Sequence, residues 1–382
     1  MLCDMARNIE PFTIETSGAE IEDLNERLRR ARWPEKETVR DWSQGVPLTY
    51  IRDLCRFWLE EYDWDARRAY LNSFPQYLTS IDELDIHFLH VPSPHFEALP
   101  LILTHGWPGS VVEFLDVIEL LTNPTARGGD VSDAFHVVVP SLPGYGFSGK
   151  PTEPGWSVLR TAKAWATLME RLGYDRFGAQ GGDWGSIVTT SMAMQNPDRI
   201  VGIHLNMVRG SPSPEDGTLT EEEDAALLRR RYYTEWDSGY NKLQATRPQT
   251  IAYSLVDSPV GQCAWILEKF WSWSDTAEDP VGALGADRIL DNVMLYWLNS
   301  TGGSSARMYW ESVGKFQPTL VTVPMGASIF PKEIFCPSRR WAERSYADIR
   351  YWGEPPVGGH FAAFEQPEIF VGEVRNFFRL VR

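Results

Sequence analysis

"AQGGDWGS" (179–186) places an aspartate, Asp183, between two glycines that each lie two residues away from it. The segment joins a strand-like run to an apolar, helix-like run. A turn of the form G-x-nucleophile-x-G between a strand and a helix holds its central side chain clear of the sheet, because glycine tolerates the tight backbone path. By itself the motif would also fit a turn whose aspartate caps the next helix. In many hydrolases serine occupies this position, so the sequence predicts a carboxylate nucleophile where a hydroxyl is usual.

Short apolar runs recur on both sides of this turn. They lie at 84–91, 99–106, 135–142, 176–182 and 200–207, and helix-like segments such as 161–173 separate the later ones. Strands that alternate with helices predict a mostly parallel sheet with helices on both faces. The predicted fold class is therefore α/β.

Two helical regions lie outside this alternation. Amphipathic patterns at 20–31 and 50–62 predict helices near the start of the chain, and a Pro-, Gly- and Ser-rich acidic segment at 209–224 interrupts the later pattern. The predicted division is a helical N-terminal region (1–80), the first part of the core (81–210), a helical cap (211–314) and the second part of the core (315–382).

A second motif, HGWPG (105–109), follows the apolar run 99–104. A turn at this place can supply one backbone N–H to an oxyanion hole, and the residue after the nucleophile can supply the other. The predicted donors are the N–H groups of Trp107 and Trp184. His105 belongs to the same turn and is predicted to shape it.

A catalytic base is predicted at His360, which lies in the glycine-rich segment 353–367 between a strand-like run and the last helix. The other histidines lie mostly in strand-like runs, where packing is the commoner role. The base needs a carboxylate to orient it, and Glu333 follows the preceding strand-like run. The order Asp183, Glu333, His360 then matches nucleophile, acid, base. The competing carboxylates nearby are Glu343, Asp348 and Glu365.

Composition excludes several classes of function. The net charge of −16 argues against nucleic acid and anionic membrane surfaces as partners. Four scattered cysteines, without a CxxC pair, favour a cytoplasmic setting, and neither a signal peptide nor a membrane anchor is evident. Neither a P-loop nor an HExxH motif is present, so we expect no cofactor and no metal.

Together these motifs resemble the epoxide hydrolases of the α/β-hydrolase superfamily, in particular the microsomal-type branch that carries a helical N-terminal region. The residues that carry the resemblance are HGWPGS (105–110), GYGFS (144–148), GGDWGS (181–186), DSPVGQCAWILEKFWSW (257–273), FPKE (330–333) and GGHFAAFEQP (358–367). The resemblance implies an α/β-hydrolase core with a helical cap. It also implies that two cap tyrosines, matched here by Tyr240 and Tyr309, donate hydrogen bonds to the epoxide oxygen.

The implied reaction converts an epoxide and water to a vicinal diol through a covalent ester on Asp183. A serine would leave a stable ether, whereas aspartate leaves an ester that water activated by His360 can cleave. The 16 tryptophans, among them Trp265, Trp271 and Trp273, could line a pocket for an apolar or aromatic epoxide, although packing is the commoner role. A homodimer is compatible with the sequence, which leaves the oligomeric state open.

Three alternatives remain at this point. A haloalkane dehalogenase uses the same aspartate nucleophile, but it would stabilise halide with Trp or Asn N–H groups and would not need the first 80 residues. A non-catalytic ligand receptor of the same fold would be expected to lose a triad member or an oxyanion glycine. An acyl-ester hydrolase would need the serine turn that is absent from this sequence.

Overall fold

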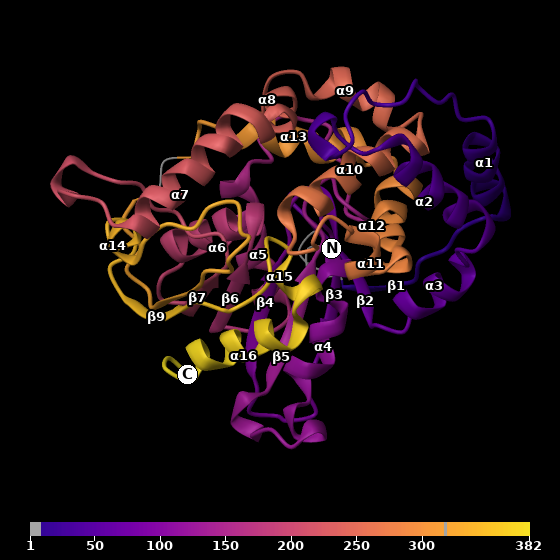
Figure 1. Cartoon of the computed structure of the whole chain (residues 1–382). Helices are drawn as coiled ribbons and strands as arrows, with labels where there is room; N and C mark the ends of the chain where they lie inside the picture. The colour runs from indigo at the N-terminus through magenta and orange to yellow at the C-terminus, as the bar shows by residue number, and fades with distance from the viewer. Residues whose placement is uncertain (1–8, 317–318) are drawn as a thin grey trace.

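A nine-stranded sheet forms the centre of the protein in the computed structural model, which describes residues 9–316 and 319–382 (Figure 1). The strand order is β1-β2-β3-β5-β4-β6-β7-β8-β9. The strands are β1 (Glu10–Phe12), β2 (Gln76–Ile81), β3 (Leu84–Val91), β4 (Leu99–Thr104), β5 (Phe135–Pro140), β6 (Phe177–Gly181), β7 (Ile200–Leu205), β8 (Met325–Ser328) and β9 (Ile349–Gly353). The pairs from β5 to β9 are parallel and the three pairs before them are antiparallel. The predicted mostly parallel α/β fold is confirmed.

Helices cover both faces of this sheet (Figure 1). The core helices are α4 (Leu115–Thr122), α5 (Val158–Arg171), α6 (Asp183–Gln195), α14 (Arg339–Ala342), α15 (Ala362–Glu365) and α16 (Pro367–Phe378). α5 packs against α6 on one face, and α4 packs against α16 on the other. A Cβ on Gly326 of β8 would lie 2.4 Å from the Phe377 ring, so this strand glycine gives α16 its close approach.

The N-terminal region, which was predicted to be helical (1–80), contains three α-helices within its described residues and also contributes strands to the sheet. Its helices are α1 (Gly18–Arg29), α2 (Leu48–Glu60) and α3 (Trp64–Leu71). β1 pairs with β2, and β2 pairs with β3 along its full length. Residues 1–8, including Cys3, lie outside the described part of the chain.

The cap lies above the ends of the parallel strands (Figure 1). It consists of α7 (Glu221–Tyr232), the π-helical turn η7 (Tyr233–Asp237), α8 (Gly239–Thr246), α9 (Pro248–Leu255), α10 (Pro259–Trp273), α11 (Pro280–Leu284), α12 (Ala286–Leu298) and α13 (Gly302–Ser312). α1 and α2 pack against α10, so the N-terminal region supports the cap from the side. A capping box of Thr220 and Glu223 begins α7. The Glu223 side chain is buried and forms an ion pair with Arg340.

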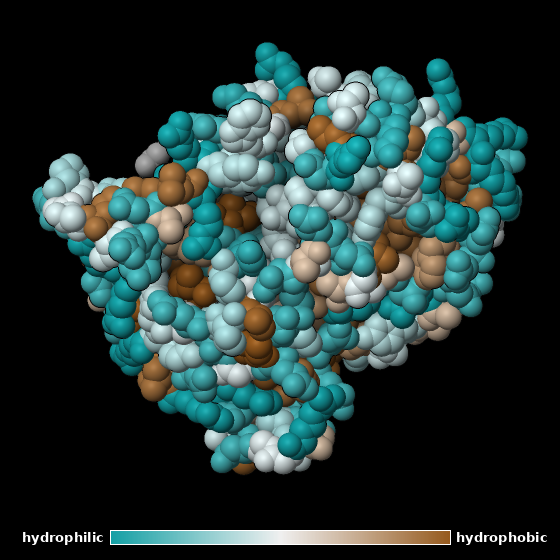
Figure 2. Space-filling view, in the orientation of Figure 1, coloured by the Kyte–Doolittle hydropathy of each residue, from teal (hydrophilic) through white to brown (hydrophobic). Residues whose placement is uncertain are grey.

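The surface in this view is largely hydrophilic, and apolar residues form small scattered patches on it (Figure 2). Within residues 9–316 and 319–382, no helix combines the length and the apolar character that spanning a bilayer requires.

Candidate active site

Asp183 occupies the sharp turn between β6 and α6. Its φ of +50° lies in the left-handed region, which non-glycine residues seldom adopt and which often marks a functional turn. The turn needs glycine beside it, because a Cβ on Gly185 would lie 1.8 Å from the carbonyl oxygen of Thr104. A Cβ on Gly181 would likewise lie 2.2 Å from the carbonyl oxygen of Gly185. The two glycines therefore allow α6 to start against the sheet and to hold the carboxylate at its edge.

The two carboxylate oxygens of Asp183 meet different neighbours. The backbone N–H of Trp107 donates to Oδ1 at 2.8 Å, and His360 Nε2 lies 3.5 Å from Oδ2. The N–H of Trp184 belongs to the first turn of α6, where backbone N–H groups have no partner within the helix. Gly106 leaves room for this arrangement, since a Cβ there would lie 2.1 Å from Asp183 Oδ1.

His105 holds the HGWPG turn in place from inside the protein. Its Nδ1 lies 2.9 Å from the carbonyl oxygen of Gly106, and the backbone N–H of Leu142 donates to its Nε2 at 3.1 Å. Burial lowers the pKa of His105 to about 4, so the ring is neutral at physiological pH. His105 thus contacts the backbone of the HGWPG turn, which the sequence predicted it to shape.

His360 is oriented by Glu333. The distance from His360 Nδ1 to Glu333 Oε1 is 2.6 Å, and the backbone N–H of Ile334 also donates to that oxygen. Burial acts to lower the pKa of His360, but the carboxylates of Glu333 and Asp183 outweigh it and raise the pKa well above its usual value. The structure thus brings together the three residues that the sequence placed in nucleophile, acid and base positions.

The competing carboxylates have other partners. Asp348 pairs with Arg350, and Glu343 pairs with Arg339. Glu365 accepts backbone N–H groups from residues 275 and 361. None of these three carboxylates has a hydrogen bond or ion pair to His360 within the described residues.

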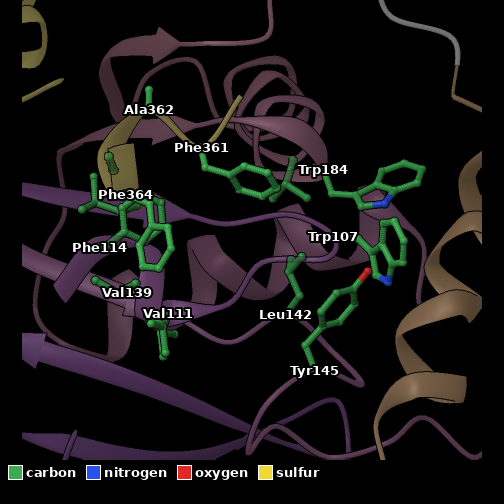
Figure 3. Packing of buried hydrophobic residues seen from close by; sticks show 14 of the residues in the cluster. Trp107, Val111, Phe114, Val139, Leu142, Tyr145, Trp184, Phe361, Ala362 and Phe364 are labelled. Atoms are coloured by element: carbon green, nitrogen blue, oxygen red, sulfur yellow. The ribbon is translucent and has the colours of Figure 1, made fainter. Parts of the chain in front are cut away.

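Tyr240 on α8 and Tyr309 on α13 face the same region from the cap. The Tyr240 ring stacks on Trp107 at 4.7 Å, while the Tyr309 ring meets Trp184 edge-on at 4.7 Å. Both phenols are buried, and burial raises the pKa of each well above its usual value, so both hydroxyls stay protonated and can donate. The Tyr240 hydroxyl lies 2.9 Å from that of Tyr233. Figure 3 shows Trp107 and Trp184 on the same side of the core cluster.

The other tyrosines of the cap are placed differently. Tyr232 and Tyr253 are exposed by 62% and 69%. Tyr296 is buried, but its hydroxyl donates to the carbonyl oxygen of Gly109 and so supports the HGWPG turn. Tyr233 lines the cavity beside Tyr240, and the two hydroxyls lie 2.9 Å apart.

A cavity of about 350 Å³ lies between the nucleophile and the cap tyrosines. Its lining includes Asp183, Trp184, Met207, Tyr240, Tyr309 and Phe335. The tryptophans considered as pocket residues pack around this cavity without lining it. Trp273 meets Tyr240 and His360 edge-on, Trp265 meets Trp107 edge-on, and Trp271 stacks on Trp42 in the N-terminal region.

A buried ion pair in the cap was missed by the sequence patterns. Lys269 is 4% exposed and pairs with Asp237 at 2.7 Å, and its ammonium lies 4.7 Å from the centre of the Tyr240 ring. Asp237 also accepts the indole N–H of Trp273 at 2.6 Å. The only available signal was a lysine within the aromatic run "EKFWSW" (268–273).

Two family models match the chain. The one described as "Epoxide hydrolase N terminus" covers residues 9–114, and the one described as "alpha/beta hydrolase fold" covers residues 100–248. A relative from Stigmatella aurantiaca (strain DW4/3-1) that carries an epoxide hydrolase name is 54% identical over 98% of this chain and 86% of its own length. "Epoxide hydrolase 1" of Oryctolagus cuniculus is 37% identical over 98% of this chain and 89% of its own.

Solved structures agree with these sequence matches. The juvenile hormone epoxide hydrolase from the silkworm Bombyx mori superposes with a TM-score of 0.90 at 32% identity, over 98% of this chain and 95% of its own. The Aspergillus niger epoxide hydrolase superposes with a TM-score of 0.88 at 32% identity, over 98% of this chain and 97% of its own. Both matches include the N-terminal region, the sheet and the cap. The chain therefore belongs to the epoxide hydrolases of the α/β-hydrolase fold.

Proposed function

We propose that this epoxide hydrolase opens its substrate through a covalent ester on Asp183. The carrying observation is the asymmetric setting of that carboxylate: the Trp107 N–H donates to Oδ1, Oδ2 lies 3.5 Å from His360 Nε2, and Asp183 lines the cavity. Oδ2 would attack one ring carbon, and the departing epoxide oxygen would take a proton from Tyr240 or Tyr309. The product of this step is a hydroxyalkyl ester whose carbonyl oxygen is Oδ1.

In the second step, water attacks the Asp183 carbonyl carbon and passes a proton to His360. Ester formation removes the negative charge of Asp183, which is one of the two charges that raise the pKa of His360. The pKa of His360 therefore falls when the ester forms, so the imidazole is neutral and can accept that proton while Glu333 still orients it. The N–H groups of Trp107 and Trp184 would bind the oxyanion, at about 3 kcal/mol for each donor. When this intermediate collapses, the leaving alkoxide takes the proton from His360 and departs as the diol. The second proton of the water returns to the tyrosine, which restores the phenol and the Asp183 carboxylate.

The substrate that this cavity favours is an apolar or aromatic epoxide. Aromatic rings and Met207 form much of its lining, and the buried tyrosine hydroxyls supply hydrogen-bond donors that can meet an epoxide oxygen. Two of the relatives are named juvenile hormone epoxide hydrolases. A panel of aryl, alkyl and polycyclic epoxides would rank the choices by kcat/KM.

A single turnover in oxygen-18 water, with enzyme in excess, tests the ester route. The route predicts that the first diol carries unlabelled oxygen from Asp183, because water attacks the carboxyl carbon and not the substrate. Label in the first diol would show direct attack by water. Asp183→Asn should abolish the first turnover, and a wild-type rate in that variant would contradict the mechanism.

Haloalkane dehalogenation is the second candidate, and one observation favours it. The indole Nε1–H of Trp184 is buried beside the nucleophile and has no hydrogen-bond partner within the described residues, so it could donate to a leaving halide. Release of halide from 1-bromobutane, measured beside diol formation from styrene oxide, separates the two reactions. We expect only the epoxide to react at a useful rate.

A further inference from the structure

A second, much smaller cavity also reaches the nucleophile. It has a volume of about 20 Å³, and Asp183 is the one residue that lines both this cavity and the substrate cavity. His360 lines it too, together with residues from the ends of β4, β6 and β7. Phe114 and Phe361 close it, and both belong to the apolar cluster drawn in Figure 3. We refer to this space as the inner chamber.

Three buried polar atoms of the inner chamber lack a hydrogen-bond partner among the described residues. They are Glu113 Oε1, Gln180 Oε1 and Asn206 Nδ2. Gln180 and Asn206 are 1% and 3% exposed, and the Gln180 amide donates to Asn206 Oδ1 at 2.6 Å, so their remaining atoms are held in fixed positions. Buried polar groups are nearly always satisfied, and ordered water is the usual partner when protein atoms are not.

The size of the inner chamber limits what can satisfy these atoms. A buried water needs about 10–15 Å³ of such space and two to four polar partners. The chamber therefore has room for one water and offers donors and acceptors from three different side chains. The same space adjoins both the carboxylate and the imidazole of the proposed catalytic pair.

Glu113 is the group that most needs an explanation. It follows the HGWPGS turn, and its Oε1 packs against Gly109, where a Cβ would lie only 1.4 Å away. Burial raises the pKa of Glu113 to about 8, so near neutral pH the carboxyl is mostly protonated and can both donate and accept. Such a group can hold a neutral water without adding a negative charge next to Asp183.

We propose that the inner chamber holds the water that hydrolyses the Asp183 ester, and that Glu113, Gln180 and Asn206 are its positioning residues. Held there, the water oxygen forms the new bond to the Asp183 carboxyl carbon, and one of its protons goes to His360 Nε2. The alkoxide that leaves takes that proton and departs as the diol. The water would thus reach the ester from the inner chamber while the alkyl group of the ester still fills the substrate cavity. This role rests on the proposed ester route.

Rapid-quench mass spectrometry with styrene oxide separates the two chemical steps. In Glu113→Leu and Gln180→Leu, we expect ester formation within about twofold of the wild-type rate and ester hydrolysis slowed at least tenfold. Glu113→Gln should hydrolyse its ester within about threefold of wild type, because an amide again offers a donor and an acceptor. The control is Glu119→Ala, which removes an exposed carboxylate from α4. It should leave the rates of both steps unchanged.

The outcomes distinguish this role from general damage and from failure of the ester route. A structural defect would slow both steps by the same factor, and either that result or wild-type hydrolysis in both leucine variants would overturn the proposal. His360→Gln serves as the reference, since it should accumulate the ester whatever Glu113 does. If His360→Gln forms no ester, the ester route itself fails and the chamber loses its role with it.

Discussion

The core side and the cap side of the substrate cavity hold their chemical groups by different means. On the core side, Asp183 lies in a turn whose backbone path depends on Gly181 and Gly185. On the cap side, Tyr240 and Tyr309 are held by ring contacts with each other, with the core tryptophans Trp107 and Trp184, and with Trp273 of the cap. Backbone turns leave short motifs in a sequence, whereas ring contacts join residues that are far apart in it. The core side should therefore tolerate less change than the cap side.

The strongest test of this contrast is Gly185→Ala. The added Cβ would meet the backbone of Thr104 at 1.8 Å, and a backbone carbonyl in the sheet cannot move aside as a flexible side chain can. We expect a loss of about 3 kcal/mol or more in the free energy of unfolding. We also expect activity to fall at least about 100-fold, because the nucleophile is displaced. Thermal melts and kcat/KM with styrene oxide measure the two effects.

Gly182→Ala in the same turn is the matched control for stability. The nearest atom to its Cβ would be Asn206 Cβ at 3.7 Å, an ordinary van der Waals contact, and the φ of Gly182 is −118°. We expect its melting temperature to stay close to that of the wild type. Equal destabilisation by the two alanines would show that the turn is not limited by the close approach at residue 185.

On the cap side, we expect a smaller loss of activity when one tyrosine hydroxyl is removed, because two hydroxyls share the epoxide oxygen. Tyr240→Phe or Tyr309→Phe removes one of two donors and leaves its ring contacts in place, so we expect ester formation to slow by about 10- to 100-fold for each variant. The double variant should lose far more than either single one. Tyr253→Phe, which changes an exposed cap tyrosine, should change nothing. If ester formation in the double variant is no slower than in the less active single variant, the two hydroxyls do not share one oxygen.

The same contrast explains what the sequence could predict. The turns around Asp183, Trp107 and His360 each consist of consecutive residues, and glycines in them restrict the backbone to few paths. The alternation of strand-like runs with helix-like segments was enough to predict the parallel sheet. The roles of these residues, the domain limits, the cytoplasmic setting and the homodimer remain predictions.

Features that depend on distant partners could not be predicted in this way. β1 is three residues long, and only its pairing with β2, over sixty residues later, makes it a strand. Lys269 looked like an ordinary cap lysine, because its burial depends on Asp237 and on the packing of two helical segments. Glu113 carried no motif of its own, and its significance comes from the atoms that surround it in three dimensions.

The smallest effect on activity is expected for Lys269→Met. The substitution keeps much of the side-chain volume but removes the cation over Tyr240, a contact worth about 1 kcal/mol, so activity should fall by roughly fivefold. Stability should fall by more, by about 3 kcal/mol, because Asp237 keeps a buried charge without its partner. Lys315→Met is the control, since that lysine lies 4.3 Å from the Trp310 ring but is exposed to solvent.

The double variant Asp237→Asn with Lys269→Met distinguishes the lost charge balance from lost packing. An asparagine at 237 can still accept the Trp273 N–H while carrying no charge, so we expect the double variant to regain part of the stability that Lys269→Met loses. Urea unfolding of the four proteins in the cycle measures the coupling. If the two losses simply add, the ion pair does not hold the cap, and ring packing alone must keep Tyr240 over the nucleophile.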